Sequence, residues 1–138
     1  MNILDWIKLL SDLNEVEKNN LQMFCQEKRV SAWDVIFHEN DYATAMYILK
    51  EGNIEITRNI NWWKVILWEV KSEELLGEMA IFWNRSKRMA SAVALTDCVL
   101  IVILSFSINE LIKKHPNLFK KIQLIINDRI LSNKNKIN

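Results

Sequence analysis

The middle of this sequence, from about residue 26 to residue 104, consists of short runs rich in Val, Ile, Trp and Tyr. Clusters of Asn, Asp, Ser and Gly separate the runs, which is the pattern of a sheet protein with many turns. Eight antiparallel strands of this kind form a β-roll of the jelly-roll type, so the predicted fold class is mainly β with flanking α. The predicted strands lie near residues 26–31, 35–37, 45–50, 53–59, 63–70, 75–76, 89–95 and 98–104.

Both ends of the chain carry helical periodicity instead. In residues 1–25 the apolar side chains recur with a helical period, and Asn14 followed by Glu17 has the spacing of a capped helix start. Residues 107–132 predict C-terminal helices, because Ser107 and Glu110 have capping-box spacing and a proline follows at a position that suits a second helix start. We therefore expect one domain over residues 1–138, a roll with N-terminal helices and C-terminal lid helices.

Charge and hydropathy narrow the function classes. The net charge of +1 is not concentrated in one half of the chain, so direct binding of nucleic acid is not expected. The longest apolar run, residues 99–104, is far shorter than the roughly 20 residues that span a membrane, and the N-terminus has no signal-peptide pattern. We expect a cytoplasmic protein with no membrane partner.

Candidate catalytic and metal-binding groups are sparse. Cys25 and Cys98 lack metal-ligand spacing and are expected to be reduced and mostly buried. His38 and His115 are isolated, so a metal-binding histidine cluster is not expected, and Ser91 has no nearby histidine to act as a base. We therefore expect no enzyme, no metal and no cofactor.

The sequence contains six tryptophans, three of them in the segment "NWWKVILW". Burial that alternates along a strand predicts Trp63 and Trp68 in the core rather than in an aromatic cage. An exposed Trp62 or Trp83 would instead mark a surface for a partner.

The segment "GEMAIFWNRSKRMAS", residues 77–91, concentrates the polar chemistry. Gly77 lacks a Cβ and permits a close approach, Glu78 offers carboxylate oxygens to paired sugar hydroxyls, and the planar fork of Arg88 matches phosphate oxygens. Backbone N–H groups would complete an anion nest, and they belong to Ala80, Met89 and Ala90. The combination describes a nucleotide monophosphate site. The plainer alternative is a salt bridge on a loop, with Arg85 and Lys87 as solvated charges.

The same segment resembles the phosphate-binding cassette of the cyclic nucleotide-binding domain, the module of the catabolite activator protein, cyclic-nucleotide-dependent kinases and gated channels. The family pattern is Gly-Glu-aliphatic-small, a variable stretch, Arg, a small pair and then Ser or Thr. It is matched here by Gly77, Glu78, Met79, Ala80, Arg88, Ala90 and Ser91. The preceding strands are similar to the family's IF-x-EGD, LYxI and GxVxV motifs, through Ile36, Phe37, Glu39, Asp41, Tyr47, Ile48, Gly52 and Ile54.

This resemblance implies a non-catalytic sensor that binds a cyclic nucleotide and signals through its C-terminal helices. It implies that Glu78 contacts the ribose 2′-hydroxyl and that Arg88 contacts the equatorial phosphate oxygen. Met89 stands where guanosine-selective members carry Thr or Ser, which favours cAMP over cGMP. The C-terminal helix would cover the base, with lid contacts expected among Arg129, Ser132 and Asn133.

The sequence also departs from the family pattern. Asn40 replaces a turn glycine, although Asn tolerates the left-handed backbone, and Trp33 with Asp34 replaces another glycine. The alternative hypothesis is a degenerate domain of the same fold that no longer binds nucleotide and serves as a protein-interaction module. No helix-turn-helix, kinase motif or channel segment is seen after residue 132, so the expected target is a protein partner or an output domain. A homodimer through the C-terminal helices is also compatible with the sequence.

Overall fold

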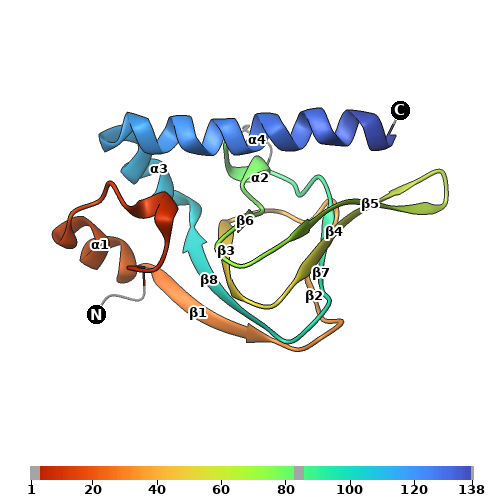
Figure 1. Ribbon diagram of the computed structural model, residues 1–138, viewed down its shortest axis with the longest axis horizontal. Coiled ribbons are helices and arrows are strands. Elements are labelled where there is room, and N and C mark those ends of the chain that lie inside the picture. Colours follow the sequence, from red (N-terminus) through yellow and green to blue (C-terminus); the bar gives the residue numbers. More distant parts are fainter. Residues whose placement is uncertain (1–3, 83–85, 138) are drawn as a thin grey trace.

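The computed structural model describes residues 4–82 and 86–137 (Figure 1). Trp83 and Arg85, which carried two of the expectations above, lie outside the described residues. The N-terminal part holds the 3-10 turn η1 (Lys8–Leu10) and helix α1 (Glu15–Gln22), and the C-terminal part holds α3 (Ser105–Lys114) and α4 (Pro116–Ile137). Between them lie β1 (Cys25–Val30), β2 (Val35–Phe37), β3 (Ala45–Glu51), β4 (Ile54–Ile60), β5 (Trp63–Val70), β6 (Leu75–Leu76), the short helix α2 (Met79–Phe82), β7 (Ser91–Ala94) and β8 (Cys98–Leu104).

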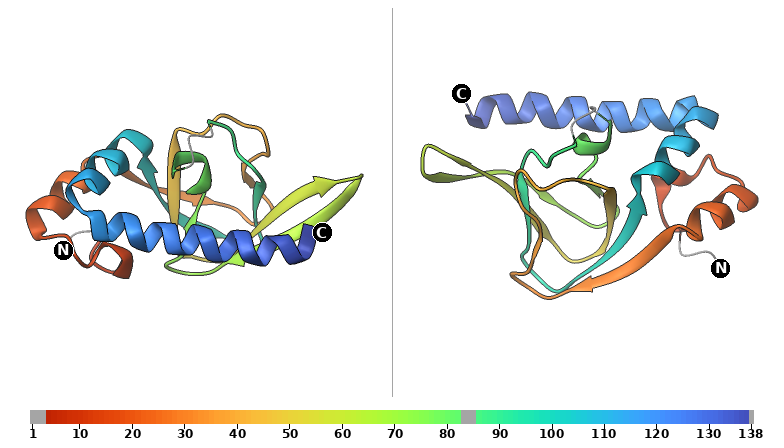
Figure 2. Two further views of the ribbon diagram at one scale, coloured as in Figure 1. Left: turned by 90° about the horizontal axis from the view of Figure 1, so that it is seen from above. Right: turned by 180° about the vertical axis from the view of Figure 1, so that it is seen from behind.

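The strands form two four-stranded antiparallel sheets, with the orders β1-β8-β3-β6 and β2-β7-β4-β5. This confirms the predicted mainly β roll of eight strands. Two apolar clusters hold it together: one fills the interior of the roll, and the other lies between the first sheet and the helices. Helix α4 crosses the roll on the side where α2 lies (Figures 1 and 2).

Strand β8 explains why the longest apolar run of the chain lies where it does. Leu100 and Cys98 face the interior of the roll, whereas Ile101 and Ile103 join the cluster formed with the helices. A strand buried on both faces needs apolar side chains at every position, unlike a strand with one solvated face.

The helix starts show one correct prediction and one error. Asn14 caps α1 as expected: its side chain accepts a hydrogen bond from the Glu17 backbone N–H at 2.9 Å, and the Glu17 carboxylate accepts from the Asn14 N–H at 3.1 Å. The predicted capping box at Ser107 is wrong. Strand β8 continues directly into α3, so the helix begins two residues earlier, and Leu104 precedes it without a side-chain cap.

The C-terminal helices otherwise follow the prediction, and α4 begins at Pro116. Helix α4 is longer than expected, because residues 133–137 contain no Gly or Pro that would stop a helix. Leu118, Ile122 and Ile126 form an apolar stripe on α4, and all three are buried in the cluster between the first sheet and the helices. Of the helices described, none is long and apolar enough to cross a membrane.

Strands β4 and β5 form a hairpin that extends beyond the rest of the roll, near the end of α4 (Figures 1 and 2). The prediction that Trp63 lies in the core is wrong, because this residue lies on the projecting part and is three-quarters exposed. Trp62 at the tip is fully exposed, whereas Trp68, closer to the roll, contacts both apolar clusters.

Candidate functional site

The segment around Arg88 is fastened to the turn between β2 and β3. The Asn40 backbone N–H donates to the Arg88 carbonyl and the Arg88 N–H donates to the Asp41 carbonyl, both at 2.8 Å. Asn40 has a φ of 74°, and the Asp41 carboxylate accepts from the His38 N–H at 2.9 Å. Asn40 therefore adopts the left-handed backbone conformation for which the family pattern has glycine. The turn holds the backbone of Arg88 in place through the two hydrogen bonds.

The Arg88 side chain points into the roll rather than toward solvent and is only 4% exposed. Its Nη1 donates to the Gly77 carbonyl at 2.8 Å and its Nη2 donates to the Ala45 carbonyl at 2.6 Å. The guanidinium lies 4.2 Å from the ring centre of Phe37 and 5.6 Å from that of Tyr47, so aromatic faces cover part of the charge.

Gly77 makes this arrangement possible. Its φ is 77°, and a Cβ placed on it would lie 2.5 Å from Nη1 of Arg88. The glycine eleven residues before the arginine is therefore required twice, by the backbone conformation and by the space that the guanidinium occupies.

Arg88 is a buried cation that has no carboxylate partner among the residues that the structure describes. It forms no salt bridge within the described part of the chain, and its Nε, which is buried, has no hydrogen-bond partner there. Burial lowers the pKa of the guanidinium, while the neighbouring Tyr47, Glu78 and Asp41 act in the opposite direction. Buried charges are normally paired, so this environment favours an anion close to Nε.

Glu78 is the other buried charged group of the segment, at 1% exposure. Its carboxylate pairs with Arg129 of α4 and not with Arg88, so the expected alternative of a Glu78–Arg88 loop salt bridge is not what the structure shows. Arg129 also donates to the Leu75 carbonyl at 2.7 Å and stacks 5.0 Å from the ring centre of Trp68. A single side chain thus joins the C-terminal helix to the acid of the segment.

The space beside Glu78 is small. A cavity of about 40 Å³ is bounded by the segment and by the interior of the roll. Its walls include Phe37, Ile56, Trp68, Gly77, Glu78, Met79, Ala80, Arg88, Met89 and Ala90. The structure therefore brings together predicted residues from both ends of the segment around one small cavity.

The remaining predicted residues are distributed differently. Met79, Ala80 and Ala90 are buried, and the Ser91 hydroxyl accepts a hydrogen bond from the Glu39 N–H at 2.9 Å. Among the expected lid residues, Arg129 reaches the site as described, and Ser132 is exposed. Asn133 is half-buried, and its Oδ1 is buried without a partner among the described residues.

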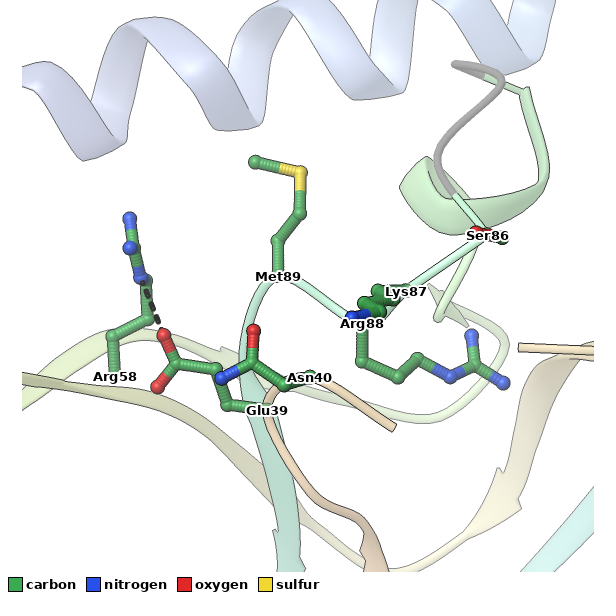
Figure 3. A pocket seen from close by; sticks show the side chains of 7 residues that line it. All are labelled: Glu39, Asn40, Arg58, Ser86, Lys87, Arg88 and Met89. Carbon is green, nitrogen blue, oxygen red and sulfur yellow. Dashed lines mark hydrogen bonds and ion pairs between the residues drawn. The ribbon is translucent and has the colours of Figure 1, made fainter. Parts of the chain in front are cut away.

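A second, larger cavity of about 450 Å³ adjoins the segment on its outer side (Figure 3). It is lined by Glu39, Asn40, Arg58, Ser86, Lys87, Arg88 and Met89. Sequence reasoning did not single out Arg58 and treated Lys87 as a solvated charge. The available signal was a cation in the otherwise apolar alternation of "IEITRNI". Trp68 was likewise predicted as a core residue only, although it also lines the inner cavity.

Among the residues described, no group of three or more His, Cys, Asp or Glu side chains is placed to hold a metal ion. Cys25 and Cys98 are both free thiols. Burial raises the pKa of the Cys25 thiol to about 11, so this thiol is almost entirely protonated at neutral pH.

A two-sheet roll, a Gly–Glu segment that shares a cavity with a buried arginine, and a C-terminal helix paired to that segment define a domain of the cyclic nucleotide-binding type. The family model described as "Cyclic nucleotide-binding domain" matches residues 27–115. The chain belongs to the cyclic nucleotide-binding domain family. This confirms the resemblance on which the sequence-based expectations depended.

The chain is also similar to individual proteins in sequence or in fold. A protein of Rhodopseudomonas palustris, named as a potassium channel protein, is 26% identical over an alignment of 145 residues that covers 96% of this chain and 33% of that protein. The Thermus thermophilus catabolite activator protein has a TM-score of 0.76 at 24% identity, covering 88% of this chain and 57% of that one. The regulatory domain of Toxoplasma gondii PKA, solved with cAMP, has a TM-score of 0.69 at 24% identity, covering 74% and 39%. This chain thus spans only part of each of these relatives.

Proposed function

We propose that this chain is a cytoplasmic, non-catalytic sensor domain over residues 1–138 that binds a cyclic nucleotide, with cAMP preferred to cGMP. The observation that carries the proposal is the buried guanidinium of Arg88, which lacks a carboxylate partner in the described part of the chain. A ligand phosphate would supply the missing negative charge at Nε, and N–H groups of the segment would add donors.

The other roles follow from the family and from position. Glu78 is proposed to accept from the ribose 2′-hydroxyl, with Gly77, Met79, Ala80, Ala90 and Ser91 forming the rest of the segment around the sugar and phosphate. Met89 offers no hydroxyl to guanine, which supports the preference for cAMP. Arg129 and Asn133 project from α4 on the side where a base would lie, and the unpartnered Oδ1 of Asn133 suits an exocyclic amine.

Binding is proposed to act on α4. The inner cavity of about 40 Å³ is small compared with the pockets that usually hold a nucleotide, and the proposed binding includes a rearrangement of the segment and of the contact between Glu78 and Arg129 of α4. Because Arg129 ties α4 to Glu78, a ligand at Glu78 changes the contacts that hold the helix. A ligand with different affinities for the two positions of α4 shifts their populations. The new position of α4 would then act on a protein partner, on an output domain or on a second copy bound through the C-terminal helices.

Calorimetric titration with cAMP and cGMP tests this function. The parent chain is expected to bind cAMP more tightly than cGMP. The Arg88→Ala variant is expected to lose about 2–5 kcal/mol of binding free energy. Arg29→Ala removes an exposed arginine of β1 and is the matched control, which should bind as the parent does. Equal cAMP binding by Arg88→Ala and by the parent would contradict the assignment.

A degenerate, interaction-only domain is the second candidate function. The small volume of the inner cavity and the pairing of Glu78 with Arg129 favour it, as does the fully exposed Trp62 on the projecting hairpin. Absence of heat and of any change in thermal stability with either nucleotide, in a parent chain shown to be folded, would support this second function over the first.

A further inference from the structure

The outer cavity of about 450 Å³ lies outside the space proposed for the nucleotide (Figure 3). It has the size of a small-molecule pocket, which is commonly 300–1,000 Å³, whereas the inner cavity holds about 40 Å³. The two cavities share Arg88 and Met89 as walls. In Figure 3 the Met89 side chain points toward α4 and the Arg88 side chain extends away from Arg58.

The charges around this outer cavity are unbalanced. The Arg88 guanidinium is bonded inside the roll to the Gly77 and Ala45 carbonyls, so the charged donors left to the outer cavity are those of Arg58 and Lys87, and Glu39 is the one acid among the lining residues. Glu39 accepts from Nε of Arg58 at 3.3 Å, which leaves the two terminal amino groups of Arg58 without a hydrogen bond in the described part of the chain. The Lys87 ammonium lies 5.4 Å from the ring centre of Tyr42 and forms no ion pair with a described residue. The open donors in this cavity are therefore positively charged.

The walls that carry these donors are fixed by hydrogen bonds. The Ala43 N–H donates to the Ser86 carbonyl at 2.7 Å, next to the bridge between Tyr42 and Lys87. The Glu39 N–H donates to the Ser91 hydroxyl, which attaches the other wall to β7. Arg58 extends from β4, which pairs with β7. These bonds fix the backbone that carries Arg58 and Lys87, so binding an anion here requires ordering of side chains but little ordering of the backbone.

We propose that this outer cavity binds a phosphate group through Arg58 and Lys87, in addition to the phosphate proposed at Arg88. The planar fork of Arg58 offers two parallel donors to a pair of phosphate oxygens, and Lys87 adds a point charge from the opposite wall. The phosphate has two chemical sources: a second phosphate of the same nucleotide, as in a cyclic dinucleotide, or a separate phosphorylated small molecule.

Calorimetry with three probes separates these sources. A cyclic dinucleotide that binds more tightly than cAMP and loses about tenfold in affinity on Arg58→Gln or Lys87→Gln supports the single-ligand form. The separate-molecule form is supported if pyrophosphate binds in the presence of saturating cAMP and if its affinity falls about tenfold in the same variants. In either case cAMP alone should change less than about twofold, because the cAMP phosphate would lie at Arg88.

Lys64→Gln is the matched control, since Lys64 is an exposed cation of the same hairpin that pairs with Glu55 and does not line the cavity. If Lys64→Gln weakens the binding of the probes as much as Arg58→Gln does, the effect comes from the loss of any nearby positive charge and not from a site at Arg58. That result would overturn the proposal. The proposal is also overturned if neither the dinucleotide nor pyrophosphate depends on Arg58 and Lys87. This proposal rests on the proposed function, because it adds a second phosphate to the one at Arg88, but the two fail separately: Arg88→Ala tests cAMP binding and Arg58→Gln tests the second phosphate.

Discussion

The carboxylate of Glu78 and the guanidinium of Arg129 form a buried ion pair that connects the cassette to α4 across 51 residues of sequence. Breaking such a pair by removing one partner leaves an uncompensated charge, at a cost of about 3–5 kcal/mol. We therefore expect Arg129→Gln to lower the free energy of unfolding by an amount in this range, measured by urea denaturation.

The double variant Glu78→Gln/Arg129→Gln should be more stable than the sum of the single effects implies, because it leaves neither charge unpaired. Lys121→Gln is the control on the same helix. It removes an exposed pair with Asp12 at 2.8 Å and should cost less than about 1 kcal/mol. Additive single effects would show that Glu78 and Arg129 do not stabilise each other.

Gly77 and Gly52 provide a comparison of two glycines with positive φ, of which only Gly77 touches the site. Their φ values are 77° and 103°, and a Cβ on Gly52 would lie 2.6 Å from the Asp97 carbonyl oxygen. Both Gly77→Ala and Gly52→Ala should lower the free energy of unfolding by at least about 1 kcal/mol.

Nucleotide affinity should separate the same two variants. A Cβ at Gly77 displaces the Arg88 guanidinium, so Gly77→Ala should weaken cAMP binding at least about tenfold, whereas Gly52→Ala should leave it nearly unchanged. Calorimetry at a temperature where both variants remain folded provides the measurement. Similar cAMP affinities in the two variants would mean that Gly77 has no role in positioning Arg88.

The fold was predictable because local signals agreed with one another. Runs of Val, Ile and aromatic residues predicted the strands, and the turn residues between them predicted where the strands end. Asn14 with Glu17 predicted the start of α1. The cassette was predictable for a similar reason, since Gly77, Glu78 and Arg88 lie within twelve residues of sequence.

The contacts between distant segments were not predictable in this way. The pairing of Glu78 with Arg129 and the bond from Arg88 to the Ala45 carbonyl depend on how the helices and sheets meet. The exposure of Trp63 depends on how far a hairpin projects beyond its neighbours, which strand periodicity does not encode. The capping pattern at Ser107 failed because β8 leads into α3 without a loop.

Glu17 gives a pH-dependent prediction. Its hydrogen bond with the Asn14 backbone, and then its contact with His115, hold the pKa of the carboxyl below its ordinary value of 4.5. Because the folded pKa is the lower one, the carboxylate stabilises the fold above about pH 4.5, and this contribution is lost as the pH falls through the folded value. Glu17→Gln should therefore be less stable than the parent at pH 7, with the difference shrinking toward pH 3.

Glu15→Gln is the control for this effect, since Glu15 lies in the same first turn of α1 but takes no part in the capping box. Its stability difference from the parent should be smaller at pH 7. Thermal denaturation across pH 3–7 measures both variants. A Glu17→Gln difference that stays constant over this range would exclude the carboxylate charge as its origin.

The tip of the β4–β5 hairpin carries a backbone cost that a glycine would remove. Asn61 and Trp62 have φ values of 52° and 74°, the signs required by a two-residue type I′ turn, whose second position favours glycine. An ordinary residue in this left-handed region costs roughly 1 kcal/mol or more. Since Trp62 is fully exposed, its ring provides no burial that offsets this cost.

Two substitutions isolate the backbone contribution at this position. Trp62→Gly and Trp62→Ala both remove the indole, but only the glycine relieves the left-handed conformation. Glycine is usually less stabilising than alanine in a strand by roughly 0.5–1 kcal/mol, so the order should invert here, with Trp62→Gly the more stable by about 1 kcal/mol. Urea denaturation of the two variants gives the sign directly. If Trp62→Ala were the more stable variant, the left-handed backbone at this position would not be strained.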